Sequence, residues 1–300
     1  MFDLVKKTPI PICGLMLACF SLGLYLGNFS IYPKLFFGLT GFVILILLIL
    51  KLLLDYSSFT NALDIITVCS TMGTFSMSLM IFSNYFVDVN GDLAFGLWIV
   101  GLLLHVLLII YFSYRYIFNN FSLDNVYPSY WIVYIGISMA SISGTFHMFN
   151  GYTWIFFVFA FILMFPTMII VCYRYLLIPV GSDINKPLIC IYAAIYSILI
   201  VAYVNSFNVV NLDFLMILYV IACLCYALSF VKLVEYRCLD FYPSYSAFSF
   251  PFVISVVASY SVYNITHYSF IMGIVIVESI IAVCCVCYVL YEYLVNVYLI

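Results

Sequence analysis

Long apolar stretches separated by short polar breaks dominate the hydrophobic pattern of this chain. A transmembrane helix needs about 20 apolar residues, because each residue adds 1.5 Å toward a hydrocarbon core about 30 Å thick. Breaks at Pro, Gly, Asn and charged residues leave ten such segments: 10–29, 33–54, 67–86, 94–117, 129–148, 153–177, 187–206, 212–234, 245–263 and 268–291. We therefore expect an all-α polytopic membrane protein in which residues 1–300 form a single transmembrane domain.

The composition leads to the same class. Hydrophobic residues make up 68% of the chain and charged residues only 7%, whereas a soluble domain has roughly 25% charged residues to cover the surface that water touches. We therefore expect membrane lipid to cover the surface of the protein. The net charge is -3 and the basic residues are scattered, so a nucleic acid is not an expected partner.

The cysteines and the N-terminus each have a second interpretation. Ten of the eleven cysteines lie within apolar runs, so we interpret the cysteines as small buried side chains and expect no disulfide framework, metal or cofactor. Lys6 and Lys7 precede the first apolar run as they would in a signal peptide. No clear cleavage site follows, and we interpret this run as a retained first transmembrane helix.

The basic residues predict the orientation of the chain. With ten spans, eight of the nine Lys and Arg residues lie on the side of the N-terminus, and Lys34 lies on the other side. Basic residues accumulate on the cytoplasmic side of a membrane. We expect both termini in the cytoplasm and the protein in the plasma or inner membrane of the cell.

Two recurring features indicate an internal repeat. A basic residue closes successive even spans, with gaps of 64, 59 and 58 residues, at Lys51, Arg115, Arg174 and Lys232. The tetrapeptide Tyr-Pro-Ser-Tyr occurs at 127–130 and again at 242–245, which is 115 residues or two periods later. Coincidence in a tyrosine-rich chain is the alternative. We favour five helical hairpins in parallel repeats about an axis along the membrane normal, a quasi-five-fold arrangement with an inner ring around a central pore.

Small residues predict which helices are inner. Gly, Ala, Ser and Thr make up a third of the odd spans but only about a seventh of the even spans, and small residues let helices approach closely. The odd helices are therefore the expected inner ring. The pore-lining candidates on them are Gly14, Ala18, Ser21, Gly73, Phe75, Gly136, Ala140, Ser143, Ala194, Ser197 and Ser249.

Few residues in the spans are able to carry chemistry. His105 and Glu278 are ionisable groups within even spans, and such groups are either functional or buried in packing. Their position on expected outer helices favours packing or a subunit contact over a proton relay. No catalytic triad, metal cluster or nucleotide motif occurs, so we do not expect an enzyme.

An inner ring without charge favours weakly hydrated anions, because cation channels normally carry acidic rings or a carbonyl filter. An uncharged substrate fits such a path as well. Pro251 in the ninth span is expected to bend its helix by removing a backbone hydrogen bond. Phe250 precedes it and is interpreted either as packing or as a ring that closes the path.

The whole chain resembles the tellurite-resistance/dicarboxylate transporter family, which includes bacterial tellurite-resistance protein A and the slow anion channels of plants. The resemblance rests on five hairpins, on odd helices led by proline, and on the run Ser-Tyr-Ser-Ala-Phe-Ser-Phe-Pro at 244–251. The opening Pro-Ile-Cys-Gly at 11–14 with Gly23 is similar to the family's first helix, and Gly-Thr-Phe at 73–75 is less similar to its third. The seventh span departs from the family because it lacks a mid-helix proline at 193–197.

The resemblance implies a pore formed by the odd helices, a homotrimer with one pore per subunit, and an occluding phenylalanine at Phe250. Two functions follow. One is a channel for chloride, nitrate or similar small anions, closed by Phe250. The alternative is a proton-coupled carrier for C4-dicarboxylates or for oxyanions such as tellurite or sulfite, with Glu278 or His105 as the relay. The inner helices carry no Arg or Lys to bind a charged substrate, which favours the channel.

Overall fold

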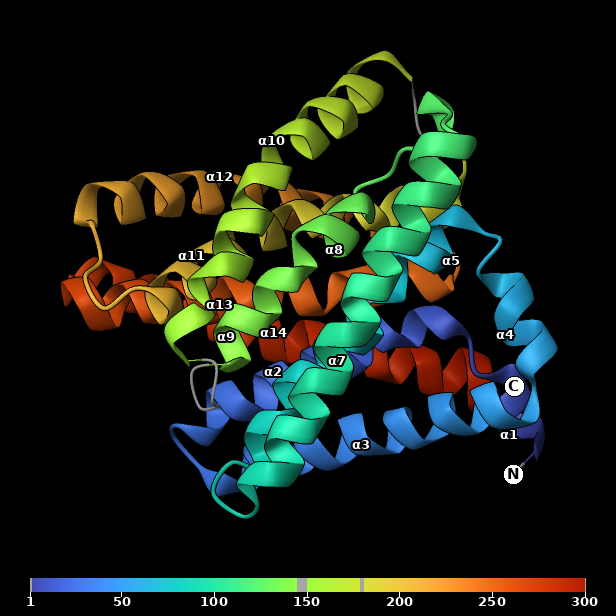
Figure 1. The fold of residues 1–300 in the computed structure, drawn as a ribbon, viewed down its shortest axis with the longest axis horizontal. Helices are drawn as coiled ribbons and strands as arrows, with labels where there is room; N and C mark the ends of the chain where they lie inside the picture. Colours follow the sequence, from blue (N-terminus) through green and yellow to red (C-terminus); the bar gives the residue numbers. More distant parts are fainter. Residues whose placement is uncertain (1, 145–149, 179–180, 300) are drawn as a thin grey trace.

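The computed structural model describes residues 2–144, 150–178 and 181–299, and within these ranges the chain is helical and has no β-strand. Nine segments in the described residues are long and apolar enough to cross a membrane (Figure 1). They are Ile10–Gly27, Ile31–Leu54, Ile66–Tyr85, Gly91–Asn119, Trp154–Leu177, Asp183–Ser206, Leu212–Tyr236, Pro243–Thr266 and Ser269–Leu299. The chain is therefore an all-helical integral membrane protein.

Five long helices, which we call the outer helices, expose much of their apolar surface. They are α3 (Ile31–Leu54), α7 (Gly91–Phe112), α10 (Trp154–Leu177), α12 (Leu212–Tyr236) and α14 (Ser269–Tyr293). Only 22–39% of their most apolar window is buried inside the protein. Their outward side chains are mainly Leu, Ile, Val and Phe, which suits contact with lipid and not with water.

Five other segments, which we call the inner segments, lie between the outer helices. In chain order they comprise η1 (Ile10–Ile12) with α2 (Cys13–Gly27), α5 (Ile66–Thr71) with α6 (Gly73–Phe82) and η2 (Ser83–Tyr85), α8 (Tyr130–Tyr134) with η5 (Gly136–Ser138) and α9 (Met139–Ser143), η8 (Asp183–Ile191) with α11 (Tyr192–Ser206), and η9 (Pro243–Phe248) with α13 (Phe250–Thr266). In the four that count as spans, 72–83% of the window is buried. The segments rich in small residues are thus the buried ones.

The fifth expected span, 129–148, is not among the nine. Its described part is broken into three short helices, and residues 145–148 lie outside the described residues. Gly136 follows the first break, where glycine weakens a helix, and the Ser138 hydroxyl donates to the Ile135 carbonyl oxygen and so competes with the helix ladder. The described part of this segment is therefore helical but divided, and the complete span stays a prediction.

Each inner segment packs against the outer helix that follows it, and against two other inner segments. The neighbouring pairs are α2 with α6, α6 with α9, α9 with α11, α11 with α13, and α13 with α2. Tyr85 illustrates one such contact, because its hydroxyl donates to the Phe20 carbonyl oxygen over 3.0 Å. Its ring fills the space that Gly23 and Gly38 leave open, so two glycines on α2 and α3 accommodate one aromatic side chain.

Both termini lie at the same end of the molecule, which we call the termini side (Figure 1). The sequence pattern did not predict the short helices α1 (Phe2–Lys7) and α4 (Tyr56–Ala62) at this end. Lys51 at the end of α3 donates from Nζ to the Lys6 carbonyl oxygen over 2.8 Å. That bond ties the N-terminal helix to the first hairpin. The remaining short elements are η3 (Ser113–Asn119), η4 (Leu123–Asn125), η7 (Asn150–Tyr152) and η10 (Leu294–Leu299).

Candidate functional site

Three cavities lie between the inner segments. The termini-side cavity has a volume of about 400 Å³, the central cavity about 50 Å³ and the far-side cavity, at the opposite end, about 300 Å³. Thr71, Leu188 and Ser246 line both the termini-side and the central cavity, so these two adjoin. The central cavity has room for a few water molecules.

All five inner segments contribute to the central cavity. Its lining is almost entirely apolar and includes Met77, Trp131, Ile135, Ile191, Ile195, Ile198 and Phe250. Gly14 and Ser246 bring the first and fifth inner segments together, because a Cβ at Gly14 would lie 3.0 Å from the Ser246 Cβ. Because glycine has no side chain, the two backbones approach each other at position 14 and close this side of the cavity.

Phe250 is the first residue of α13 and follows a sharp change in the backbone. Ser249 before it has φ -106° and ψ -78°, and the Ser249 hydroxyl donates to the Ser246 carbonyl oxygen over 2.6 Å. Pro251 was expected to bend a continuous helix. Instead the span is divided into the 3₁₀-helix η9 and the α-helix α13, with Pro251 in the first turn of α13. A proline in the first turn costs no hydrogen bond, because the N–H groups there have no partner within the helix.

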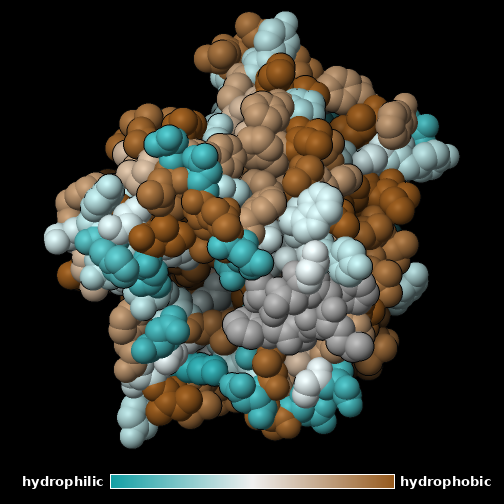
Figure 2. Space-filling model, turned by 60° about the vertical axis from the view of Figure 1, so that its left-hand side comes forward, coloured by the Kyte–Doolittle hydropathy of each residue, from teal (hydrophilic) through white to brown (hydrophobic). Residues whose placement is uncertain are grey.

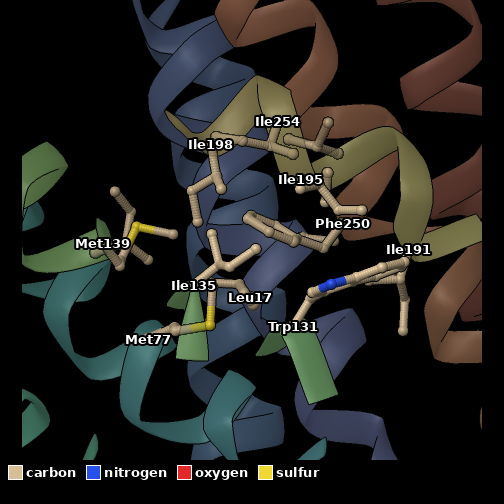
Figure 3. Close-up of a cluster of buried hydrophobic side chains, with 14 of the residues drawn as sticks. Leu17, Met77, Trp131, Ile135, Met139, Ile191, Ile195, Ile198, Phe250 and Ile254 are labelled. Carbon is tan, nitrogen blue, oxygen red and sulfur yellow. The ribbon is translucent and has the colours of Figure 1, made fainter. Parts of the chain in front are cut away.

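The Phe250 ring lies in the middle of an apolar cluster (Figure 3). Ile195 and Ile198 of α11 and Ile254 of α13 lie around it, as do Leu17, Met77, Ile135 and Met139 from the other inner segments. Met139 and Ile254 also line the far-side cavity, whereas Ile135 and Ile198 line the central one. The cluster therefore fills the space between these two cavities, and only 6% of Phe250 is exposed.

Trp131 supplies an unused hydrogen-bond donor at the central cavity. Its side chain is 2% exposed, and Nε1 has no acceptor among the described residues. The Thr74 hydroxyl, by contrast, donates to the Thr71 carbonyl oxygen of its own helix over 2.8 Å. An unpaired N–H in an apolar site is costly, and it is a ready partner for an acceptor that enters the cavity. Sequence reasoning missed Trp131 because only the fold turns it toward Phe250.

The chain matches the SLAC1 family, described as voltage-dependent anion channels, over residues 12–294. It belongs to this family. The resemblance seen in the sequence motifs is thereby confirmed, and anion channels or transporters are the class that the family indicates. The comparison with curated proteins gives no match.

In this SLAC1-family chain, some of the pore-lining candidates come together and others do not. Gly14, Gly136 and Ala194 line the central cavity with Phe250 and Pro251, and Ser21 lines the far-side cavity. The remaining candidates do not line any of these three cavities within the described residues; they are Ala18, Gly73, Phe75, Ala140, Ser143, Ser197 and Ser249. Composition identified the inner segments but not which face of each segment borders a cavity.

His105 and Glu278 belong to outer helices, yet both side chains point inward and are 0% and 4% exposed. His105 is fully hydrogen-bonded, with Nδ1 2.7 Å from the Ser76 Oγ and Nε2 3.1 Å from the Val133 carbonyl oxygen. These are the contacts of a packing residue.

Glu278 differs from His105. It interacts with the Ser259 hydroxyl, but its Oε2 has no hydrogen-bond partner in the part of the chain that the structure describes. It lies with Tyr219, Tyr226 and Ser255 in a small space between α11, α12, α13 and α14. An outer helix therefore carries an incompletely bonded acid toward the inner segments, which composition alone did not predict.

The two larger cavities differ in charge. Lys6, Lys7 and Lys51 line the termini-side cavity. Among the described residues that line the far-side cavity none is charged, and its polar groups are Ser, Tyr and Asn side chains. The Lys51 ammonium lies 3.7 Å from the Asp55 carboxylate. The termini-side cavity is therefore bordered by basic residues, whereas the polar groups of the described residues that border the far-side cavity are all neutral.

Proposed function

We propose that the chain conducts small anions, such as chloride or nitrate, along the line of the three cavities. In this proposal the ten spans form five hairpins, the inner segments surround one pore per subunit, and Phe250 closes it. The observation that carries the proposal is the Phe250 ring in the apolar cluster between the central and the far-side cavity. The family and the lysines of the termini-side cavity support an anionic substrate.

The closed state has a simple physical basis. An ion passing Phe250 would have to leave its water among side chains that offer it no charge, and an apolar constriction excludes ions by this desolvation. Removing the ring lets water reach from one cavity to the other. The barrier to anions then falls without any new binding site.

The direct test is Phe250→Ala, recorded by two-electrode voltage clamp in oocytes or in planar bilayers. We expect chloride and nitrate currents to rise by at least about tenfold, because removal of a desolvation barrier of a few kcal/mol changes a rate by that factor or more. Phe252→Ala is the matched control. Phe252 is buried two residues further along α13 but packs on Tyr226 and does not line the central cavity. An equal rise in both variants, or in neither, contradicts a gate at Phe250.

Proton-coupled transport of dicarboxylates or oxyanions is the second candidate function, and Glu278 is the observation that favours it. A buried carboxyl with one oxygen that has no partner among the described residues is able to gain and lose a proton during a transport cycle. His105 is a weaker relay, since both ring nitrogens are already hydrogen-bonded.

We also propose a homotrimer with both termini in the cytoplasm. The trimer rests on the family resemblance and the orientation on the basic residues. Mass measurement of the protein in lipid nanodiscs tests the first. For the second, a membrane-impermeant thiol reagent applied to intact cells is expected to label Asn208→Cys and to leave Asn119→Cys unlabelled. Labelling of position 119 alone would reverse the orientation.

A further inference from the structure

An asparagine recurs near the same end of four inner segments. Asn28, Asn84, Asn205 and Asn264 are separated by 56, 121 and 59 residues, which are one, two and one periods of the hairpin repeat. Asn28 caps the end of α2, Asn84 lies in η2, and the other two lie in the last turns of α11 and α13. The counterpart in the remaining segment would fall near residue 145, outside the described residues.

The fold brings these four side chains to one place. All four line the far-side cavity of about 300 Å³, and the other polar residues in its lining are Ser21, Tyr25, Tyr260 and Ser261. Figure 2 is turned toward this end of the molecule, where hydrophilic residues surround a hollow, whereas hydrophobic residues predominate along its flank. Four carboxamides from four separate helices therefore border the mouth that leads toward Phe250.

Backbone contacts orient some of the carboxamides and leave donors unused. Nδ2 of Asn28 donates to the Tyr25 carbonyl oxygen over 2.9 Å, and Nδ2 of Asn205 donates to the Val201 carbonyl oxygen over 2.8 Å. Each Nδ2 carries two hydrogens, so one N–H of each of these two side chains has no partner among the described residues. The Ser83 hydroxyl donates to the Met80 carbonyl oxygen over 2.6 Å and makes only a long contact of 3.4 Å to Oδ1 of Asn84, and neither contact uses the N–H groups of Asn84.

We propose that these four asparagines form the selectivity mouth of the far side, where their N–H groups replace part of the water around an anion before it reaches the apolar cluster. This inference rests on the proposed anion conduction. Neutral donors suit the task, because conduction requires a site that binds enough to admit the ion and weakly enough to release it. The far-side cavity carries these neutral asparagines, whereas the termini-side cavity carries lysines. The two mouths therefore attract anions by different chemistry.

Asparagine at a helix end has an ordinary structural use, because its side chain bonds nearby backbone groups. Charge introduced after folding separates the two roles. We would place Asn264→Cys in the Phe250→Ala background, since Asn264 is exposed, and record chloride current before and after methanethiosulfonate reagents that carry a sulfonate or a trimethylammonium group. The Phe250→Ala variant alone gives the baseline for the native cysteines.

The sulfonate reagent should lower the chloride current at least about fivefold and the ammonium reagent should raise it, as expected for a unit charge close to the ion. Asn208→Cys is the matched control, because Asn208 is exposed at the same end but does not line the cavity. Equal effects of the two reagents at position 264 indicate a steric effect and overturn the proposal. Equal responses at positions 208 and 264 overturn it as well.

The half-buried positions give a second measurement. Asn84→Asp and Asn205→Asp, each in the Phe250→Ala background, should shift the reversal potential in a chloride gradient toward cation permeation. An unchanged reversal potential in folded protein, as judged by a single peak in size-exclusion chromatography, overturns the selectivity role. A Phe250→Ala variant that carries no anion current overturns the proposed function itself, and these two failures are therefore distinguishable.

Discussion

His105 joins three helices through one side chain, with Nδ1 2.7 Å from the Ser76 hydroxyl of α6 and Nε2 3.1 Å from the Val133 carbonyl oxygen of α8. Gly136 leaves room for the imidazole ring, because a Cβ at this position would lie 2.9 Å from the His105 Cε1. A polar group within a membrane span is costly unless it is paired. Here the pairing accounts for the histidine without any transport role.

Replacement of His105 by Leu should lower stability. Without the histidine the Ser76 hydroxyl is free to donate to the Gly73 carbonyl oxygen, 2.9 Å away, but the Val133 contact is lost and the leucine branches approach Gly136. We expect a loss on the order of 2 kcal/mol, seen as a lower melting temperature in detergent. His267→Asn is the control, since His267 is exposed at φ 54° and asparagine tolerates that backbone. Equal melting temperatures for His105→Leu and the native chain contradict the packing role.

Two glycines of α7 should respond oppositely to alanine. A Cβ at Gly101 would lie 2.9 Å from both the Met80 nitrogen and the Ser76 carbonyl oxygen, whereas a Cβ at Gly96 meets nothing within 4 Å. Gly101→Ala should therefore force α6 and α7 apart at a cost of about 1–3 kcal/mol. Gly96→Ala should stabilise by about 0.5–1 kcal/mol, because alanine favours the helix. Thermal unfolding of both variants tests the prediction. A destabilised Gly96→Ala would refute the expected opposite responses.

Trp131→Phe should reduce anion passage while leaving the fold intact. The substitution keeps an aromatic ring at the central cavity and removes the indole N–H, which has no acceptor in the described part of the chain. In the Phe250→Ala background we expect the chloride current to fall by about threefold to tenfold, the effect of roughly 1 kcal/mol from one hydrogen bond. Trp154→Phe, on the exposed side of α10, serves as the control. If both variants carry the same current, the indole does not contact the passing ion.

Glu278→Gln separates the two candidate functions. The amide keeps the size of the side chain but neither gains nor loses a proton near neutral pH. For a channel, anion flux into liposomes should ignore an imposed proton gradient in the native chain and in the variant alike. Gradient-driven uptake that disappears in Glu278→Gln would instead establish the carrier, and uptake that survives in the variant would remove Glu278 as the relay.

Much of the architecture could be predicted from local patterns. Nine of the ten expected spans coincide with apolar helices of the described residues that are long enough to cross a membrane. Eight of them lie within four residues of their predicted bounds, and the last extends to Leu299. The length of an apolar run is set by the bilayer and does not depend on neighbouring helices. The described part of the fifth span is divided into three short helices around Gly136, which lies against Met77 and His105. No local pattern reveals such a contact.

The candidate site was less predictable than the fold. Phe250, Gly14 and Ala194 border the central cavity, and their roles as gate and pore lining stay predictions. The hydroxyls of Ser143 and Ser197 donate to carbonyl oxygens of their own helices. Trp131 and the four asparagines of the far-side cavity were not singled out. The spacing of the asparagines is visible in the sequence. Only the fold shows that the four segments end around the far-side cavity.

The sequence by itself determined that this chain is an integral membrane protein, which of its segments are apolar and long enough to span a membrane, and which of these are rich in small residues. Hydropathy and residue size are properties of each segment alone. Only the tertiary structure decided which face of each inner segment borders a cavity, that His105 and Glu278 point inward, and that Phe250 meets isoleucines from two other segments. Rotation of a helix about its axis depends on all of its neighbours at once. A helix with apolar residues on every side carries no polar stripe to record that rotation.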